Sequence, residues 1–191
     1  KMNTMVKTVD TNLGNYRIPE AARALQEFVD DMSNWYVRRC RDRFWAKGME
    51  QDKVNAYMTL YTALVTVCKA AAPMIPFMTE EIYQNIVRSV DASAKESIHL
   101  CDFPVYNAEQ VDEKLEADMD LVLKIVVLGR ACRNGAAIKN RQPIGQMYVK
   151  AEASLPDYDE AIILDELNVK NITFTDDVSN FTTYNFKPQL K

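Results

Sequence analysis

The stretch that decides the fold lies in the first quarter of the chain and reads Ser33-Asn34-Trp35-Tyr36-Val37-Arg38-Arg39-Cys40-Arg41-Asp42-Arg43-Phe44-Trp45. Apolar side chains lead into it at three- and four-residue spacing, namely Leu25, Phe28, Met32, Trp35 and Tyr36. This spacing is typical of an amphipathic helix. Pro19 suits the first turn of that helix and Gly48 suits its end. The pattern therefore predicts one helix from residue 19 to residue 47.

An α-helix turns by about 100° per residue, so it would divide the basic residues of this stretch between two faces. Arg39 and Arg43 continue the apolar stripe, and we expect them to line a groove or to form internal ion pairs. The outward face is expected to carry four polar and aromatic side chains, Asn34, Arg38, Arg41 and Trp45. Exposed arginines beside a tryptophan suit phosphate contact and base stacking. For any single arginine, the alternative is an ion pair with an acid on a neighbouring helix.

Further helices are predicted at residues 2–13, from Asp52 to the break at Pro73, after an N-cap at Thr79, and at residues 108–137. Beyond Gly145 the pattern changes to strands at 146–151, 169–175 and 181–186, with a helix at 157–167 between the first two. The third strand would be reached through a turn at 176–180. We therefore expect a mainly α protein, with a helix bundle at residues 1–143 and a small α/β appendage at residues 144–191.

The charge balance points in two directions. A net charge of −4 and a pI near 5.1 argue, taken alone, against nucleic-acid binding. The positive charges are nevertheless clustered, because residues 38–47 hold five cations against the single acid Asp42. A second segment without any acid contains Arg130, Arg133, Lys139 and Arg141. Such segregation can create a positive patch on a negative protein. We expect the second segment to contact a nucleic-acid backbone, and we hypothesise that both segments form one surface.

Residues that support catalysis or metal binding are scarce. The four cysteines are scattered singly, which favours free thiols over a zinc site or a disulfide framework. The only histidine, His99, is expected at a surface or an interface, and no glycine-rich phosphate loop is present. No apolar run approaches the roughly 20 residues that span a bilayer. The first residue is Lys1, which is consistent with an excised fragment. We therefore expect no active site, no metal site and no membrane contact.

The stretch from Ser33 to Arg39, followed by Arg43-Phe44-Trp45, resembles the first-helix signature of the isoleucyl-tRNA synthetase anticodon-binding domain. Further similar segments follow in the same order: 56–61, 72–84, 99–104, 128–133, 139–143 and 166–170. The proline-flanked segment at 72–84 is shared with valyl, leucyl and methionyl relatives. The tryptophan-tyrosine-arginine stretch is what indicates the isoleucine family.

The resemblance implies the anticodon-binding helix bundle of a class I aminoacyl-tRNA synthetase, a cytoplasmic ligase that joins isoleucine to its tRNA with ATP and Mg²⁺. The catalytic signatures His-Ile-Gly-His and Lys-Met-Ser-Lys-Ser are missing, so catalysis and editing are expected elsewhere in the parent enzyme. We expect no cofactor in this fragment. Its expected partners are isoleucine tRNA and the remaining domains of the parent enzyme.

The predicted tRNA contacts are Arg38, Arg39, Arg41, Arg43, Trp45, Lys47, Arg130, Arg133, Lys139 and Arg141. Among these, Arg38, Arg41 and Trp45 are the expected outward contacts. Two alternatives stay open at this point. One is the equivalent domain of a valyl- or leucyl-tRNA synthetase, and the other is a helical module that docks proteins. Steep weakening of binding with salt would favour RNA over apolar docking.

Overall fold

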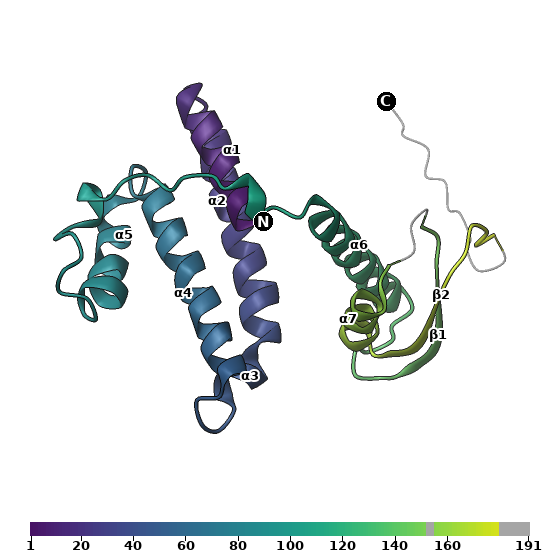
Figure 1. Cartoon of the computed structure of the whole chain (residues 1–191). Coiled ribbons are helices and arrows are strands. Elements are labelled where there is room, and N and C mark those ends of the chain that lie inside the picture. The colour runs from purple at the N-terminus through teal and green to yellow at the C-terminus, as the bar shows by residue number, and fades with distance from the viewer. Residues whose placement is uncertain (152–154, 180–191) are drawn as a thin grey trace. The chain divides into compact units, whose positions relative to one another are not determined.

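The computed structural model describes residues 1–151 and 155–179, which divide into two compact units, Lys1–Val111 and the part of the chain from Asp112 onward. The first unit contains the helices α1 (Met2–Gly14), α2 (Ile18–Asp31), α3 (Arg41–Trp45), α4 (Gln51–Ala71) and α5 (Pro76–Tyr83). Short π and 3₁₀ segments complete it: η1 (Met32–Val37), η2 (Gln84–Arg88), η3 (Ile98–Leu100) and η4 (Ala108–Gln110). The second unit contains α6 (Glu113–Gly135), β1 (Ile144–Val149), α7 (Asp157–Leu167) and β2 (Val169–Phe174). The prediction of a mainly α protein with a small α/β part is confirmed (Figure 1).

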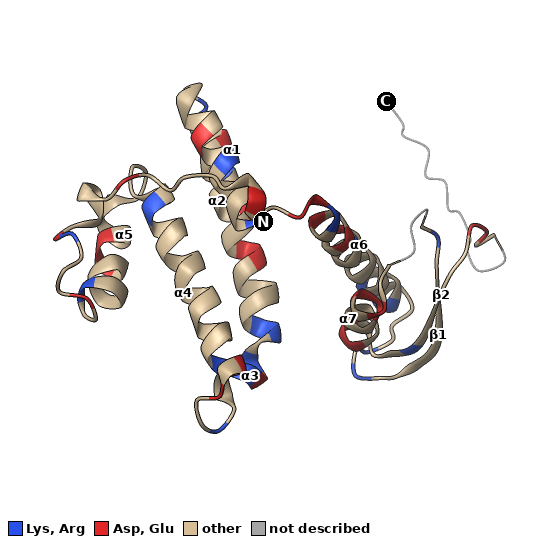
Figure 2. Cartoon of the chain, in the orientation of Figure 1, with Lys and Arg blue, Asp and Glu red and all other residues tan. Residues whose placement is uncertain are grey.

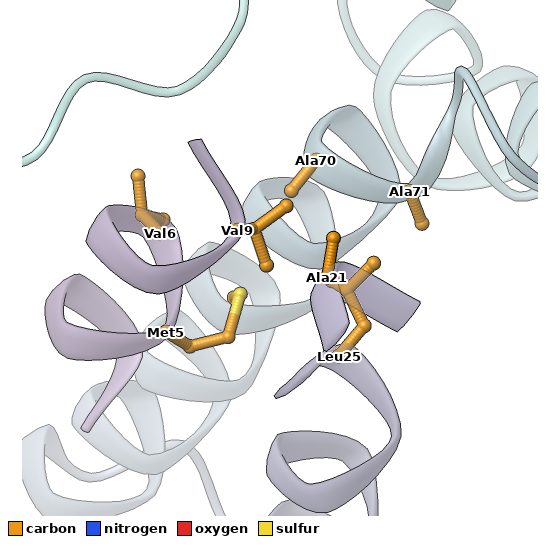
Figure 3. Close-up of a cluster of buried hydrophobic side chains, with 7 residues drawn as sticks. All are labelled: Met5, Val6, Val9, Ala21, Leu25, Ala70 and Ala71. Atoms are coloured by element: carbon orange, nitrogen blue, oxygen red, sulfur yellow. The ribbon is translucent and has the colours of Figure 1, made fainter. Parts of the chain in front are cut away.

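The core of the first unit lies where α1, α2 and α4 pack side by side (Figure 1). Its buried side chains are Met5, Val6, Val9, Ala21, Leu25, Ala70 and Ala71 (Figure 3). The alanines of α2 and α4 bring the helix backbones close together, while the larger residues of α1 fill the space between them. This packing anchors one end of α2 and α4, and the rest of both helices extends from it toward α3.

Helix α5 begins earlier in the chain than predicted. Pro76 begins α5, whereas Thr79 was expected to cap that helix. Thr79 lies inside the helix and is buried, and its hydroxyl donates to the carbonyl oxygens of Ile75 at 3.0 Å and Pro76 at 3.1 Å. The predicted N-cap was therefore wrong, because Pro76 itself supplies a residue without an N–H at the first helical position.

The second unit is built around one βαβ element. Asp112 caps α6 by accepting a hydrogen bond from the Leu115 N–H at 2.9 Å. The strands β1 and β2 pair in parallel, with Ile144 opposite Val169 and Val149 opposite Phe174, and α7 is the crossover between them. The buried side chains come from α6, α7 and the chain around them: Val122, Ile125, Val126, Leu155, Ile163, Leu167 and Val169.

The strands and helix predicted after residue 145 are confirmed with small shifts of their ends. The third predicted strand, residues 181–186, lies outside the described residues. The contacts group the chain differently from the expected boundary between residues 143 and 144, since they place α6 with the α/β element. A helix of 23 residues that packs on α7 is part of the core of that unit.

Candidate nucleic-acid interface

The expected single helix at residues 19–47 is interrupted twice. After α2 the backbone forms the π-helical segment η1, and a turn at Cys40 then separates η1 from α3. A π segment closes its turn one residue later than an α-helix, so it displaces the faces of the helix that follows. The buried positions are Cys40 and Phe44, each one residue beyond the predicted inward arginines Arg39 and Arg43. The prediction that Arg39 and Arg43 face inward was therefore wrong, because the inward positions lie one residue later in the chain.

Aromatic contacts fix α3 against α4. The ring of Phe44 lies 5.0 Å from that of Tyr57 and 6.3 Å from that of Tyr36, the latter edge to face. The Tyr36 hydroxyl donates to the carbonyl oxygen of Ala56 at 3.0 Å, and burial raises the pKa of Tyr36. The Tyr57 hydroxyl donates to the carbonyl oxygen of Phe44 at 3.3 Å. A short helix of five residues is thus held in place by its side chains.

Arg43 forms an ion pair across the α3–α4 hairpin. Its Nη2 lies 2.7 Å from Asp52 Oδ1, and its Nε lies 2.8 Å from Asp52 Oδ2. The Arg43 guanidinium hydrogen-bonds this carboxylate, which lowers the pKa of Asp52 and raises the pKa of Arg43. The alternative considered for any single arginine, an ion pair with an acid on a neighbouring helix, is therefore confirmed at Arg43. Its predicted contact with tRNA stays a prediction.

A hydrogen bond from a side chain to the backbone and a glycine in a left-handed conformation shape the loop between α3 and α4. Lys53 Nζ donates to the carbonyl oxygen of Ala46 at 2.8 Å. Gly48 adopts a φ of 77°, a left-handed conformation that glycine accepts without a steric cost. Lys47 is exposed on this loop, and its predicted contact with tRNA stays a prediction.

Arg38, Arg41 and Trp45 are exposed, so the prediction that they face outward is confirmed. Trp45 is 77% exposed, which is unusual for so large an apolar side chain. The guanidinium carbon of Arg41 lies 5.5 Å from the centre of the Trp45 ring, within the range of a cation–π contact. Arg39 is half-buried beside them. We call the set Arg38, Arg39, Arg41, Arg43, Trp45 and Lys47 the basic tip, and Figure 2 shows Lys and Arg gathered on α3 and on the helical segment that enters it.

The second basic segment is arranged differently, beginning with Arg130. The Arg130 guanidinium pairs with Glu166 of α7, whose side chain is only 2% exposed. This ion pair links α6 to α7 within the second unit. The arginine side chain is itself 41% exposed, so the pair lies at the border between core and surface. Contact between Arg130 and RNA stays a prediction, but its ion pair is a sufficient structural reason for an arginine here.

Arg133 is only 3% exposed, and this corrects its predicted contact with a nucleic-acid backbone. Its guanidinium donates to four carbonyl oxygens, those of Lys139, Gln142, Leu167 and Asn168. These oxygens belong to the loop after α6 and to the end of α7. Buried carbonyls need donors, and a forked guanidinium supplies several from one side chain. Arg133 is therefore a structural clamp inside the second unit.

Lys139 and Arg141 are exposed, as expected for residues that meet a ligand. They lie on the loop that Arg133 holds through its bonds to Lys139 and Gln142. The two basic segments belong to different units, so their convergence into one surface stays a prediction.

His99 has no catalytic arrangement around it. Its Nε2 lies 4.0 Å from Glu80 Oε2, while Ser97 Oγ donates directly to the same carboxylate oxygen at 2.8 Å. The hydrogen bond from the Gln84 amide, followed by those from Ser97 and the Ile98 N–H, holds the pKa of Glu80 below its usual range. Since Ser97 bonds the carboxylate itself, the imidazole does not activate its hydroxyl. The prediction of a surface histidine is confirmed by its exposure.

The residues that the structure describes, 1–151 and 155–179, lack both a membrane-spanning helix and a metal-binding cluster. None of their helices is both long and apolar enough to cross a membrane. Nor do they contain a group of three or more His, Cys, Asp or Glu side chains arranged to hold a metal ion. The four cysteines occur as free thiols, of which Cys132 is exposed.

Comparisons with known proteins place the chain beside tRNA ligases. A family model described as the anticodon-binding domain of tRNA ligase matches residues 1–149. The chain is 54% identical over 190 residues to an isoleucine–tRNA ligase of Clostridium novyi (strain NT) and 50% identical over 190 residues to that of Clostridium tetani (strain Massachusetts / E88). It is 41% identical over 195 residues to isoleucine–tRNA ligase 2 of Bacillus cereus (strain ATCC 14579). Each match covers 100% of this chain but only 18% of the relative.

Proposed function

The chain belongs to the anticodon-binding domain family of tRNA ligases, and we propose that its basic tip binds the anticodon end of a tRNA. The observation that carries this proposal is the exposed pair of Arg41 and Trp45 on a short helix that aromatic contacts hold rigid. An indole that is 77% exposed and lies beside a cation has little value for the core of the protein. It is well suited to a ligand that combines negative charge with flat, apolar rings, and a single-stranded RNA loop has both.

The interaction divides into two kinds of contact. Arginine carries its charge at all physiological pH values and can meet two phosphate or base acceptors at once. These contacts position the RNA without reading its sequence. Stacking of an unpaired base on the indole of Trp45 adds about 1–3 kcal/mol. The aromatic packing of Phe44 and Tyr57 keeps the tip from moving when the base arrives, so little ordering cost is paid on binding.

We further propose that the parent protein is a cytoplasmic isoleucine–tRNA ligase, which joins isoleucine to its tRNA at the expense of ATP. The support is 54% identity to one such ligase and the signature from Ser33 to Trp45. The chain spans 18% of the length of that relative, so ATP, Mg²⁺ and the reacting groups are assigned to other domains of the parent. The proposed partners are isoleucine tRNA and those domains.

The proposal is tested by moving the anticodon between tRNAs. The dissociation constant of the 191-residue chain is measured by fluorescence anisotropy for isoleucine tRNA, for a second tRNA, and for that second tRNA carrying the isoleucine anticodon. We expect the transplanted anticodon to recover most of the affinity difference between the two natural tRNAs. Equal affinity for all three would show that the chain does not recognise the anticodon, and transfer of a valine or leucine anticodon instead would assign the domain to those ligases.

A further inference from the structure

We propose that the basic tip, together with the adjoining Trp35, holds two base-stacking sites rather than one, the second being the pair of Trp35 and Arg38. This inference rests on the proposed function, since both sites would serve the same RNA loop. The guanidinium carbon of Arg38 lies 5.5 Å from the centre of the Trp35 ring, the same distance as in the pair of Arg41 and Trp45. The two pairs differ in direction, since Arg38 reaches back three residues and Arg41 reaches forward four.

Trp35 lies on the π-helical segment η1. It follows the apolar stripe of Phe28 and Met32, which are also half-buried. In the structure no residue of Met32–Val37 is fully buried, and Trp35 is half-buried. Tyr36 and Val37 are the residues that pack on the cluster of Cys40, Phe44 and Ala56 instead. Single π turns recur at functional sites, and this one contains a tryptophan that is not fully buried.

Four arginines lie between the two tryptophans in the sequence, and two of them, Arg38 and Arg41, each lie over one indole. Arg38 Nε donates to the carbonyl oxygen of Asn34 at 2.8 Å, which fixes the direction of its side chain across Trp35. Each guanidinium covers part of one indole and brings positive charge close to it. A base stacked on either indole would therefore have a cation near its own phosphate.

The two sites are expected to differ in strength. Trp45 is 77% exposed and offers a ring face to solvent, whereas half-buried Trp35 offers a smaller area. Since stacking scales with the area that the rings share, Trp45 would take a base more fully than Trp35. Together they fit a ligand with two unpaired bases, as in a tRNA anticodon loop, rather than a duplex whose bases already stack on one another.

The test uses the fact that Trp35 and Trp45 are the only two tryptophans in the chain. Trp45→Phe leaves Trp35 as the sole tryptophan, and Trp35→Phe leaves Trp45. Each variant is titrated with the anticodon stem-loop of isoleucine tRNA while tryptophan fluorescence and RNA anisotropy are recorded together. We expect fluorescence quenching in both variants at the RNA concentration where anisotropy rises, with the larger quench from Trp45. When Arg38→Gln is added to Trp45→Phe, the quenching of Trp35 fluorescence by RNA should fall several-fold.

The matched control adds Arg23→Gln, which removes the same charge from an exposed arginine near the opposite end of α2, to Trp45→Phe. It should leave the quench of Trp35 unchanged. If RNA binds and quenches Trp45 while Trp35 fluorescence stays constant, the second site does not exist, although the proposed function survives. If anisotropy shows no RNA binding by either the parent chain or its variants, the proposed function itself fails, and the two-site inference fails with it.

Discussion

The two basic segments of this chain look alike in sequence and behave differently in the structure. Residues 38–47 present exposed arginines beside an exposed tryptophan, while Arg130 and Arg133 turn into the second unit to hold Glu166 and four carbonyl oxygens. The difference lies in the acceptors around each segment. Where α7 ends beside α6, buried oxygens need donors, and arginines are used there as structural parts. At the tip, aromatic packing and the hydrogen bonds of Tyr36 and Tyr57 already complete the core. Four charged and aromatic side chains therefore remain at the surface, namely Arg38, Arg41, Trp45 and Lys47.

The largest effect on stability is expected from Arg133→Ala. The change removes four hydrogen bonds from one buried guanidinium. The carbonyl oxygens of Lys139 and Asn168 keep backbone donors, whereas those of Gln142 and Leu167 lose the donor that Arg133 supplies. We expect a loss of about 3 kcal/mol or more in the free energy of unfolding of the second unit. Urea denaturation followed by circular dichroism measures it. Arg133→Lys is the matched control and should recover only part of the loss, since a single ammonium cannot meet four acceptors. A stability equal to that of the parent would contradict the role of Arg133 as a structural clamp and would leave tRNA contact as its predicted role.

Removing either partner of the ion pair between Arg130 and Glu166 should lower the free energy of unfolding, and the two losses should differ in size. Arg130→Ala removes the guanidinium that pairs with a carboxylate only 2% exposed, and we expect a cost of about 2 kcal/mol. Glu166→Gln leaves a partly exposed guanidinium that water can reach, so its cost should be smaller. Thermal unfolding of both variants decides the order. The reverse order would mean that Arg130, rather than Glu166, is the buried partner.

Gly129 provides a second test of the contact between α6 and α7. A methyl group added at this position would overlap the side-chain methyl groups of Leu167, which is itself buried. Gly129→Ala should therefore destabilise the second unit by about 1–2 kcal/mol, although alanine is the better helix former. Leu167→Val in the same chain should recover part of the loss by making room. If Gly129→Ala raises the melting temperature instead, the helices do not pack as closely as the structure shows.

The smallest effect is expected at the tip, from Asp52→Asn. The pair with Arg43 is largely exposed, and such pairs add little to stability. The Arg43 hydrogen bond lowers the pKa of Asp52 in the folded state below its ordinary value of 3.8. The stability that the ion pair contributes is therefore fully present above pH 3.8, and it is lost as the pH falls through the folded-state pKa. The melting temperatures of parent and variant should thus differ slightly near neutral pH and converge in acid. A large difference at neutral pH would show that the tip depends on this pair.

Much of the fold followed from local sequence signals. The apolar spacing predicted the helices, and the change to alternating residues after Gly145 predicted β1 and β2. The π segment η1 was not predicted, because nothing in the order of residues from Met32 to Val37 distinguishes a π turn from an α turn. Its effect was to shift burial from Arg39 and Arg43 to the next residues, Cys40 and Phe44.

The role of Arg133 could not be predicted for a different reason. Two of its acceptors, the carbonyl oxygens of Leu167 and Asn168, lie more than thirty residues away in the sequence. A charge pattern counts cations but does not show which buried oxygens will approach them in space. The one local signal was Gly129, since a glycine inside a helix often marks close packing of another element. The outward group of Arg38, Arg41 and Trp45 was predictable because exposure there needs no distant partner.

The salt dependence of tRNA binding by Arg38→Ala/Arg41→Ala tests most directly whether the tip is the RNA surface. The matched control is Lys139→Ala/Arg141→Ala, which removes the same charge from exposed positions on the second segment. We expect the tip variant to bind isoleucine tRNA at least about tenfold more weakly and to lose about 0.7–0.9 from the slope of log K against log salt for each phosphate contact removed. The control should lose less. A tip variant that binds as tightly as the parent, with the same salt slope, would contradict the assignment of the tip as the RNA surface.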